Sequence, residues 1–164
     1  YYLGDNYTDE AKLIIDLLRE RNKKISFAES CTGGLLSEYI TNISGASDVF
    51  MGSVVSYDNA VKQNVLKVPE EILKEYGAVS EECASFMAKG VKDLMKTDYS
   101  VSITGIAGPG GATDAKPVGL VYIGVASKNG VSVYKNIFNG DRQQVRMRSA
   151  KKALFYLLNI IKDN

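Results

Sequence analysis

The sequence predicts an α/β fold in which helices cover both faces of a mixed sheet. Strand-like and helix-like segments alternate along most of the 164 residues, and the pair Asn129-Gly130 marks a hairpin between two later strands. Strands that alternate with helices are typical of parallel pairing, whereas a hairpin adds antiparallel pairing. We therefore expect a three-layer α/β/α sandwich. Its length favours a single domain over residues 1–164.

Each expected element follows from a local pattern. Helices are expected where apolar residues recur at helical spacing, and Thr8, Asp58 and Ser80 are residue types that cap helix starts. Strands are expected where β-branched and aromatic residues gather. The expected helices cover 8–22, 32–43, 58–66, 69–76, 80–95 and 141–162, and the expected strands cover 24–28, 49–57, 99–104, 120–127 and 131–138.

Three turns in this arrangement are candidates for a ligand site. In an open α/β sheet, ligands bind beyond the carboxyl ends of the parallel strands. Residues 28–34, 56–62 and 104–111 each follow such a strand end. We expect these turns to converge on one crevice.

The composition excludes several classes of function. With 20 basic and 19 acidic residues the net charge is +1, which gives no general attraction to nucleic acid or to an anionic membrane. No run of about 18 apolar residues predicts a membrane span. The first residues lack the pattern of a secretory signal, so we expect a cytoplasmic protein. Cys31 and Cys83 are too few for a disulfide framework and are expected to be free thiols.

The absence of histidine restricts the chemistry further. No histidine occurs in the chain, which excludes Ser-His and Cys-His mechanisms and His-ligated zinc. We expect neither a metal nor another cofactor. A serine nucleophile in this chain needs lysine, tyrosine or a carboxylate as its base. Lys62 is the candidate base, Tyr57 is a candidate to relay or orient the proton, and Asp58 is better explained as a helix cap. The alternative for this motif is an edge tyrosine and a solvated lysine.

Ser30 is the candidate nucleophile because it lies at an expected strand-to-helix turn. There its hydroxyl would meet the free N–H groups and the positive dipole end of the helix. Gly33 and Gly34 would let a substrate approach closely. Two alternatives stay open: Ser30 or Thr32 only caps the helix, or the neighbouring Cys31 is the nucleophile.

Two further features are candidates for binding an anion. The loop 105–117 is rich in glycine and can cradle a phosphate or carboxylate, although it matches neither the P-loop nor the dinucleotide fingerprint. Arg142 and Arg146 lie one helical turn apart and can form a phosphate clamp. The alternative for the loop is a purely structural role. The alternative for the two arginines is that Asp141 simply offsets their positive charge at the helix start.

Five motifs taken together carry a resemblance to a known family. In order and over nearly the whole chain, they resemble the C-terminal domain of the competence/damage-inducible protein CinA. The motifs are Ala28-Glu29-Ser30-Cys31-Thr32-Gly33-Gly34, Ser56-Tyr57-Asp58-Asn59-Ala60-Val61-Lys62, Thr104-Gly105-Ile106-Ala107-Gly108-Pro109, Lys116-Pro117-Val118-Gly119 and Gly140-Asp141-Arg142-Gln143-Gln144-Val145-Arg146.

The resemblance implies a fold of the anticodon-binding-domain-like type and a nicotinamide mononucleotide deamidase activity that releases nicotinic acid mononucleotide and ammonia. It implies a role in the pyridine nucleotide cycle and a homo-oligomer, commonly a dimer. It places the nucleophile, base and assisting tyrosine on Ser30, Lys62 and Tyr57. The expected substrate-binding residues are Thr32, Gly33, Gly34, Asn59, Thr104, Gly105, Gly108, Arg142 and Arg146.

The expected reaction is a metal-independent acyl transfer from the substrate carboxamide to Ser30. Backbone N–H groups at the start of the following helix would hold the oxyanion. Arg142, Arg146 and the loop 105–111 would hold the 5′-phosphate. The alternatives are a non-catalytic module that binds pyridine nucleotides and a serine amidase that acts on another small amide.

Overall fold

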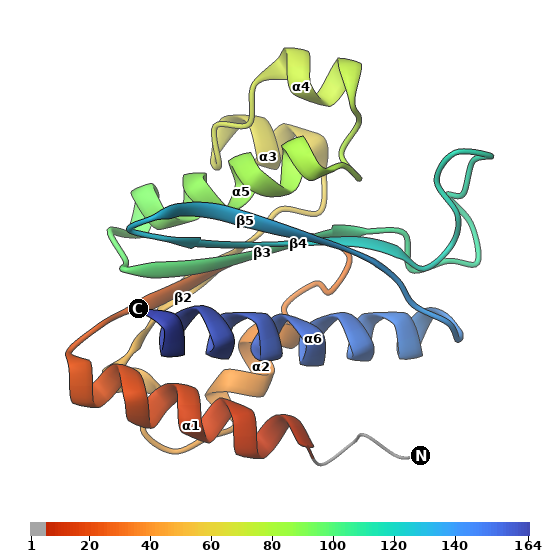
Figure 1. Ribbon diagram of the computed structural model, residues 1–164. Coiled ribbons are helices and arrows are strands. Elements are labelled where there is room, and N and C mark those ends of the chain that lie inside the picture. The colour runs from red at the N-terminus through yellow and green to blue at the C-terminus, as the bar shows by residue number, and fades with distance from the viewer. Residues whose placement is uncertain (1–5) are drawn as a thin grey trace.

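A computed structural model describes residues 6–164 and arranges them in three layers (Figure 1). The expected α/β fold with a mixed sheet is confirmed. The helices are α1 (Asn6–Arg21), α2 (Leu35–Thr41), α3 (Asn59–Asn64), α4 (Glu70–Glu75), α5 (Glu81–Met95) and α6 (Arg142–Asp163), with a short 3-10 helix, η1, at Ala46–Asp48. The strands are β1 (Ile25–Glu29), β2 (Phe50–Val55), β3 (Tyr99–Gly105), β4 (Leu120–Ser127) and β5 (Gly130–Ile137).

The sheet has the order β2-β1-β3-β4-β5. Strand β1 pairs in parallel with β2 and β3, whereas β4 pairs antiparallel with β3 and β5. Every residue of β1 is buried, as the central strand of a parallel group requires. The carboxyl ends of β1, β2 and β3 therefore meet at one edge of the sheet.

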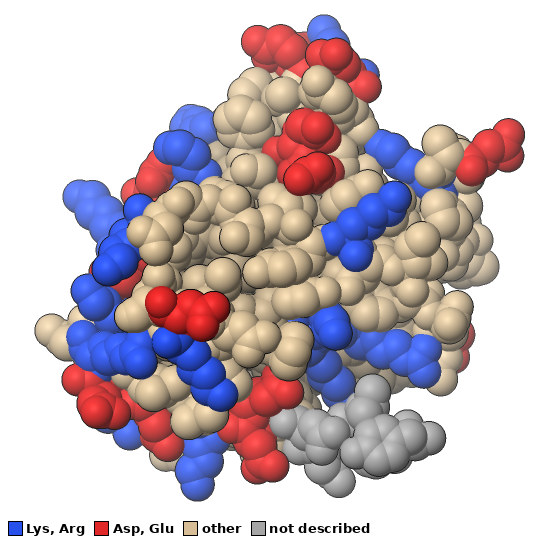
Figure 2. Space-filling model, in the orientation of Figure 1, with Lys and Arg blue, Asp and Glu red and all other residues tan. Residues whose placement is uncertain are grey.

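Helices cover both faces of this sheet. In Figure 1, α1, α2 and α6 lie on one face and α3, α4 and α5 on the other. Phe27 of β1 and Leu154 of α6 belong to the larger core on the first face, and Met87 of α5 belongs to a smaller core on the second. On the face visible in Figure 2, basic and acidic side chains are interspersed. None of the helices in the described part of the chain has the length and apolar character that a membrane span needs.

Buried hydroxyl groups join the central strands to α5. Ser100 and Ser102 of β3 donate hydrogen bonds of 2.6 Å to the carbonyl oxygens of Ala88 and Ala84. These side chains alternate along β3, so they share the sheet face on which α5 packs. Thr104 continues the series toward the carboxyl end of the strand. A row of hydroxyl side chains thus extends along β3 to the expected site.

The structure corrects one expected helix start near the N-terminus. The helix α1 begins at Asn6, so Thr8 lies inside it and is not its N-cap. The ring of Tyr7 stacks on Tyr39 at 4.0 Å between centroids, and its hydroxyl accepts a hydrogen bond from Asn42. These contacts with α2 hold the first turn in helical form. The expected caps at Asp58 and Ser80 are confirmed, since each side chain accepts a backbone N–H of its helix.

A second correction concerns the segment after Ser30. Helix α2 begins at Leu35 instead of Thr32, and Gly34 is its N-cap residue. Gly33 has φ +60° and Gly34 has φ +111°, values that place both in the left-handed region favoured by glycine. A turn therefore separates Ser30 from α2, and neither Ser30 nor Thr32 caps the helix.

Candidate active site

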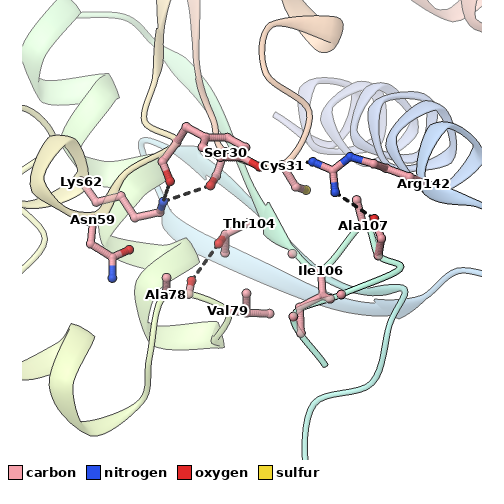
Figure 3. Close-up of a pocket in the computed structure, with 15 residues that line it drawn as sticks. Ser30, Cys31, Asn59, Lys62, Ala78, Val79, Thr104, Ile106, Ala107 and Arg142 are labelled. Atoms are coloured by element: carbon pink, nitrogen blue, oxygen red, sulfur yellow. Dashed lines mark hydrogen bonds between the residues drawn. The ribbon is translucent and has the colours of Figure 1, made fainter. Parts of the chain in front are cut away.

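The three expected turns converge on one cavity of about 300 Å³ at the carboxyl edge of the parallel strands (Figure 3). Its walls come from the turn after β1, the turn between β2 and α3, the segment before α5, the loop after β3 and the start of α6. The lining residues are Ser30, Cys31, Tyr57, Asn59, Lys62, Ala78, Val79, Thr104, Gly105, Ile106, Ala107, Gly108, Gly110, Gly111 and Arg142.

Ser30 is fixed at the strand end by its backbone. Its N–H donates to the carbonyl of Ile103 in β3 at 2.9 Å, and its own carbonyl accepts the N–H of Gly33 at 3.1 Å. The side chain is 8% exposed, so the hydroxyl reaches the cavity from a largely buried position. The turn therefore presents one rigidly held hydroxyl to a ligand.

Glu29, just before Ser30, anchors the far side of this turn. Its fully buried carboxylate accepts hydrogen bonds from the hydroxyl of Thr32 and from the N–H groups of Leu36 and Ser37, at 2.7, 2.9 and 3.0 Å. The hydroxyl of Ser37 adds a fourth. The amides of Leu36 and Ser37, in the first turn of α2, thus serve Glu29 and are not free to hold an oxyanion beside Ser30.

Arg146 clamps the outer side of the same turn. Its guanidinium donates to the carbonyl oxygens of Cys31 and Thr32 at 3.0 and 2.8 Å. The side chain does not line the cavity, and neither do Thr32, Gly33 and Gly34. These four expected substrate-binding residues therefore form or hold the turn after β1 and do not line the cavity.

Lys62 approaches Ser30 from α3 (Figure 3). Although it is a lysine, it is only 1% exposed, and its Nζ lies 2.9 Å from the hydroxyl oxygen of Ser30. The same nitrogen lies 2.6 Å from the carbonyl oxygen of Ser56 and 3.1 Å from that of Tyr57. Burial disfavours the charged form and lowers the pKa of Lys62 from its ordinary value.

The three partners of Lys62 fix the direction of a proton transfer. A neutral amine has two N–H groups and one lone pair, whereas a carbonyl oxygen only accepts. The carbonyls of Ser56 and Tyr57 therefore take both N–H groups. The lone pair is left for Ser30, the one partner whose hydroxyl donates a hydrogen. In its neutral form, Lys62 is thus oriented to accept the proton of Ser30.

Tyr57 contributes to the site mainly through its backbone. Its carbonyl contacts Lys62, while its side chain is 62% exposed and its hydroxyl accepts a hydrogen bond from Arg142 at 3.2 Å. Arg142 also donates to the carbonyl of Gly108 at 2.8 Å. The phenol thus lies against a guanidinium, and the expected proton relay between this phenol and Lys62 is not among the hydrogen bonds of Lys62.

Thr104 and Cys31 lie on the remaining walls. The Thr104 hydroxyl donates to the carbonyl of Ala78 at 2.7 Å, which leaves its lone pairs toward the cavity. Burial raises the pKa of Cys31 to about 12, so its thiol is protonated near neutral pH. The thiolate is the reactive form, and Cys31 is therefore a poor rival to Ser30 as nucleophile.

Sequence reasoning missed Glu29, Ala78 and Val79. Ala78 and Val79 line the cavity from the segment before α5 and carry no reactive group that a search for chemistry detects. Glu29 had a usable signal, since an acidic residue that ends a buried strand just before a helix needs N–H donors. Asn59, Gly105 and Gly108 line the cavity as expected.

A buried lysine amine directed at a serine hydroxyl, in a cavity at the strand ends, defines an α/β protein with a serine–lysine pair. Comparison with known proteins agrees with the α/β fold and identifies the family. The family model described as the CinA C-terminal domain matches residues 8–161, and the chain belongs to that family.

Related proteins support the assignment. A CinA-like protein of Thermotoga neapolitana is 46% identical over 163 residues, which cover 99% of this chain and 40% of that protein. A putative competence-damage inducible protein of Caldicellulosiruptor bescii is 47% identical over 93% of this chain and 37% of its own length. The chain thus spans less than half of these relatives.

Solved structures share the fold. The crystal structure of competence/damage inducible protein CihA from Agrobacterium tumefaciens aligns with a TM-score of 0.92 and 36% identity, covering 97% of this chain and 99% of that one. A CinA superfamily protein from Escherichia coli aligns with the same TM-score at 28% identity, over 98% of this chain and 94% of that one.

Proposed function

We propose that the chain is an amidohydrolase that converts nicotinamide mononucleotide to nicotinic acid mononucleotide and ammonia. The observation that carries the proposal is the 2.9 Å contact between Lys62 Nζ and the hydroxyl oxygen of Ser30. Burial favours the neutral amine, and two carbonyl oxygens fix its orientation. Such a pair supplies both the nucleophile and the base that amide hydrolysis requires.

In the first half of the reaction, Ser30 attacks the carboxamide carbon while its proton moves to Lys62. The new C–O bond forms as the carbonyl π-electrons move to oxygen. Lys62 then gives the proton to the amide nitrogen, the C–N bond breaks, and ammonia leaves an ester on Ser30. In the second half, water attacks this ester and gives a proton to Lys62. That proton returns to the Ser30 oxygen as the C–O bond to the enzyme breaks.

The oxyanion needs N–H donors other than those of Leu36 and Ser37, because Glu29 occupies these two groups. We assign this role to the backbone of the loop 105–111, which lines the cavity. This assignment replaces the expected helix start with a loop that lines the same cavity as Ser30.

Arg142 is the group best placed to bind the phosphate. Its hydrogen-bond partners are the neutral oxygens of Gly108 and Tyr57, and it lies at the end of the cavity away from Lys62 (Figure 3). A cation held by neutral acceptors keeps its attraction for an anion. The cavity of about 300 Å³ suits the pyridine ring and the reacting carboxamide, with the phosphate at its mouth.

Release of ammonia tests the proposal. Purified protein without added metal should release ammonia from nicotinamide mononucleotide and much less from free nicotinamide, which lacks the phosphate. Ser30→Ala should abolish release yet still bind the mononucleotide. Binding by the wild-type protein without ammonia release would instead establish a non-catalytic nucleotide module. Faster release from free nicotinamide would indicate an amidase for another small amide.

A further inference from the structure

The cavity contains two basic side chains and no acidic one. Of the residues 6–164 that line it, Lys62 and Arg142 are the basic members, and aspartate and glutamate are absent. Neither side chain takes part in an ion pair within this part of the chain. Both are held by neutral oxygen atoms, which include the carbonyls of Tyr57 and Gly108.

The surrounding elements do not supply a compensating anion inside the cavity. Burial raises the pKa of Cys31, in the turn after β1, to about 12, and that of Cys83, in α5, to about 11, so both thiols are neutral near pH 7. The carboxylate of Asp58 is exposed and caps α3. The buried carboxylate of Glu29 is shared among four donors on the far side of the turn. The Asp58 charge favours protonated Lys62, but no carboxylate of residues 6–164 forms an ion pair with it, so a ligand carboxylate would be its first contacting counter-ion.

We propose that the acid product is held in this cavity as an ion pair between its carboxylate and the Lys62 ammonium, so that carboxylates bind with uptake of a proton and inhibit the enzyme. The inference rests on the proposed function, because it follows the proton at the end of that reaction. The neutral carboxamide substrate offers no such ion pair.

Atom positions at the end of the second half-reaction lead to this ion pair. Water attacks beside Lys62, since Lys62 accepts its proton, so the new oxygen of the product lies next to Nζ. The carboxylic acid first formed is a much stronger acid than an ammonium ion. Its O–H bond therefore breaks and the proton moves to Nζ, without any other change in bonding. Thr104 does not oppose this state, because its hydroxyl can rotate from the Ala78 carbonyl toward a carboxylate oxygen.

One group then gives opposite pH dependences to catalysis and to product binding. Turnover needs neutral Lys62, so kcat/KM should rise with pH until that side chain has lost its proton. Carboxylate binding needs protonated Lys62, so product affinity should fall by about tenfold per pH unit above the pKa of the free site. Below that pKa, Lys62 is already charged and product affinity should become independent of pH.

Calorimetry with nicotinic acid mononucleotide tests the inference without turnover. Titrations into wild-type protein, in two buffers with different ionisation enthalpies, measure the protons taken up on binding. We expect uptake to approach one proton per site at a pH where kcat/KM has reached its plateau. Nicotinamide mononucleotide titrated into Ser30→Ala is the matched control. It carries the same phosphate but no carboxylate and should bind with much smaller uptake.

Lys62→Met should bind the acid product without pH-dependent proton uptake beyond that of the amide control. If this variant does not fold, the titrations of the wild-type protein still show whether the carboxylate binds with uptake of a proton. Equal proton uptake for acid and amide would overturn the inference, as would product inhibition that is unchanged between pH 6 and 9. Ammonia release with no proton-linked product binding would leave the proposed function intact. Proton-linked carboxylate binding without ammonia release would reject the proposed function and retain the ion pair.

Discussion

Replacing the two arginines at the start of α6 one at a time should separate substrate binding from support of the active-site turn. Arg142 and Arg146 are one helical turn apart, yet only Arg142 lines the cavity. Arg142→Ala should raise KM by about 10- to 150-fold, which corresponds to the roughly 1.5–3 kcal/mol of a charge-assisted bond to phosphate. Its unfolding free energy should change little, because the side chain is exposed.

Arg146→Ala should have the opposite profile. It removes two hydrogen bonds from a charged donor to the carbonyls of Cys31 and Thr32, which have exposed fractions of 7% and 0%. Hydrogen bonds to charged groups contribute roughly 1.5–3 kcal/mol, and because Arg146 is half-buried we expect a loss near the lower end of that range. The loss is about 2 kcal/mol, or about 4–8 °C in Tm for a chain of this size. Displacement of Ser30 should lower kcat by about tenfold or more.

Thermal unfolding and steady-state ammonia release measure both sets of changes. Arg146→Lys is the control, because it keeps the charge but cannot make both bonds in the same geometry. It should recover only part of the lost stability and kcat. If Arg146→Ala raises KM alone and leaves Tm and kcat unchanged, the assignment of Arg146 to the turn is refuted and the arginine contacts the substrate.

Four further substitutions test the site, the support of its turn and the packing of α5. Cys31→Ala should keep ammonia release within about twofold, because the raised pKa, about 12, leaves the thiol protonated near neutral pH; an inactive variant would point to a thiol nucleophile. Glu29→Gln should lower the free energy of unfolding in urea by about 2 kcal/mol or more, since an amide group cannot accept all four hydrogen bonds of the carboxylate; unchanged stability would contradict its anchoring role. Gly90→Ala should destabilise α5 by about 3 kcal/mol, because the added Cβ would lie 2.0 Å from the Leu66 carbonyl oxygen. Gly110→Ala, with open space around the added atom, should unfold at nearly the wild-type urea concentration.

Local patterns predicted most of the fold because the strands and long helices obey their own periodicities. Strand β3 and the hairpin of β4 and β5 lie within one residue of their expected bounds. The errors fall where tertiary contacts decide. Tyr7, in the first turn of α1, stacks on Tyr39, and two left-handed glycines, Gly33 and Gly34, delay the start of α2.

The site was predictable as a set of turns but not as a set of contacts. The convergence of three turns follows from parallel strands, whose carboxyl ends share an edge. The separate positions of Arg142 and Arg146 do not follow from their spacing. That spacing puts both on one face of α6, but Arg146 points to the carbonyls of Cys31 and Thr32. Which acceptors a long side chain finds depends on the packing of α6 against the turn.

Backbone pairing explains how a lysine can serve as the base without a carboxylate to hold it. The N–H of Ser56 donates to the carbonyl of Glu29 at 2.7 Å, and the N–H of Ser30 donates to Ile103. These bonds fix the ends of β2, β1 and β3 relative to one another. Lys62 Nζ donates a 2.6 Å hydrogen bond to the Ser56 carbonyl at the end of β2. The sheet therefore sets the distance between this nitrogen and the Ser30 hydroxyl. A carboxylate partner would raise the lysine pKa, whereas neutral carbonyls hold the amine in place and preserve the uncharged form that the proposed reaction needs.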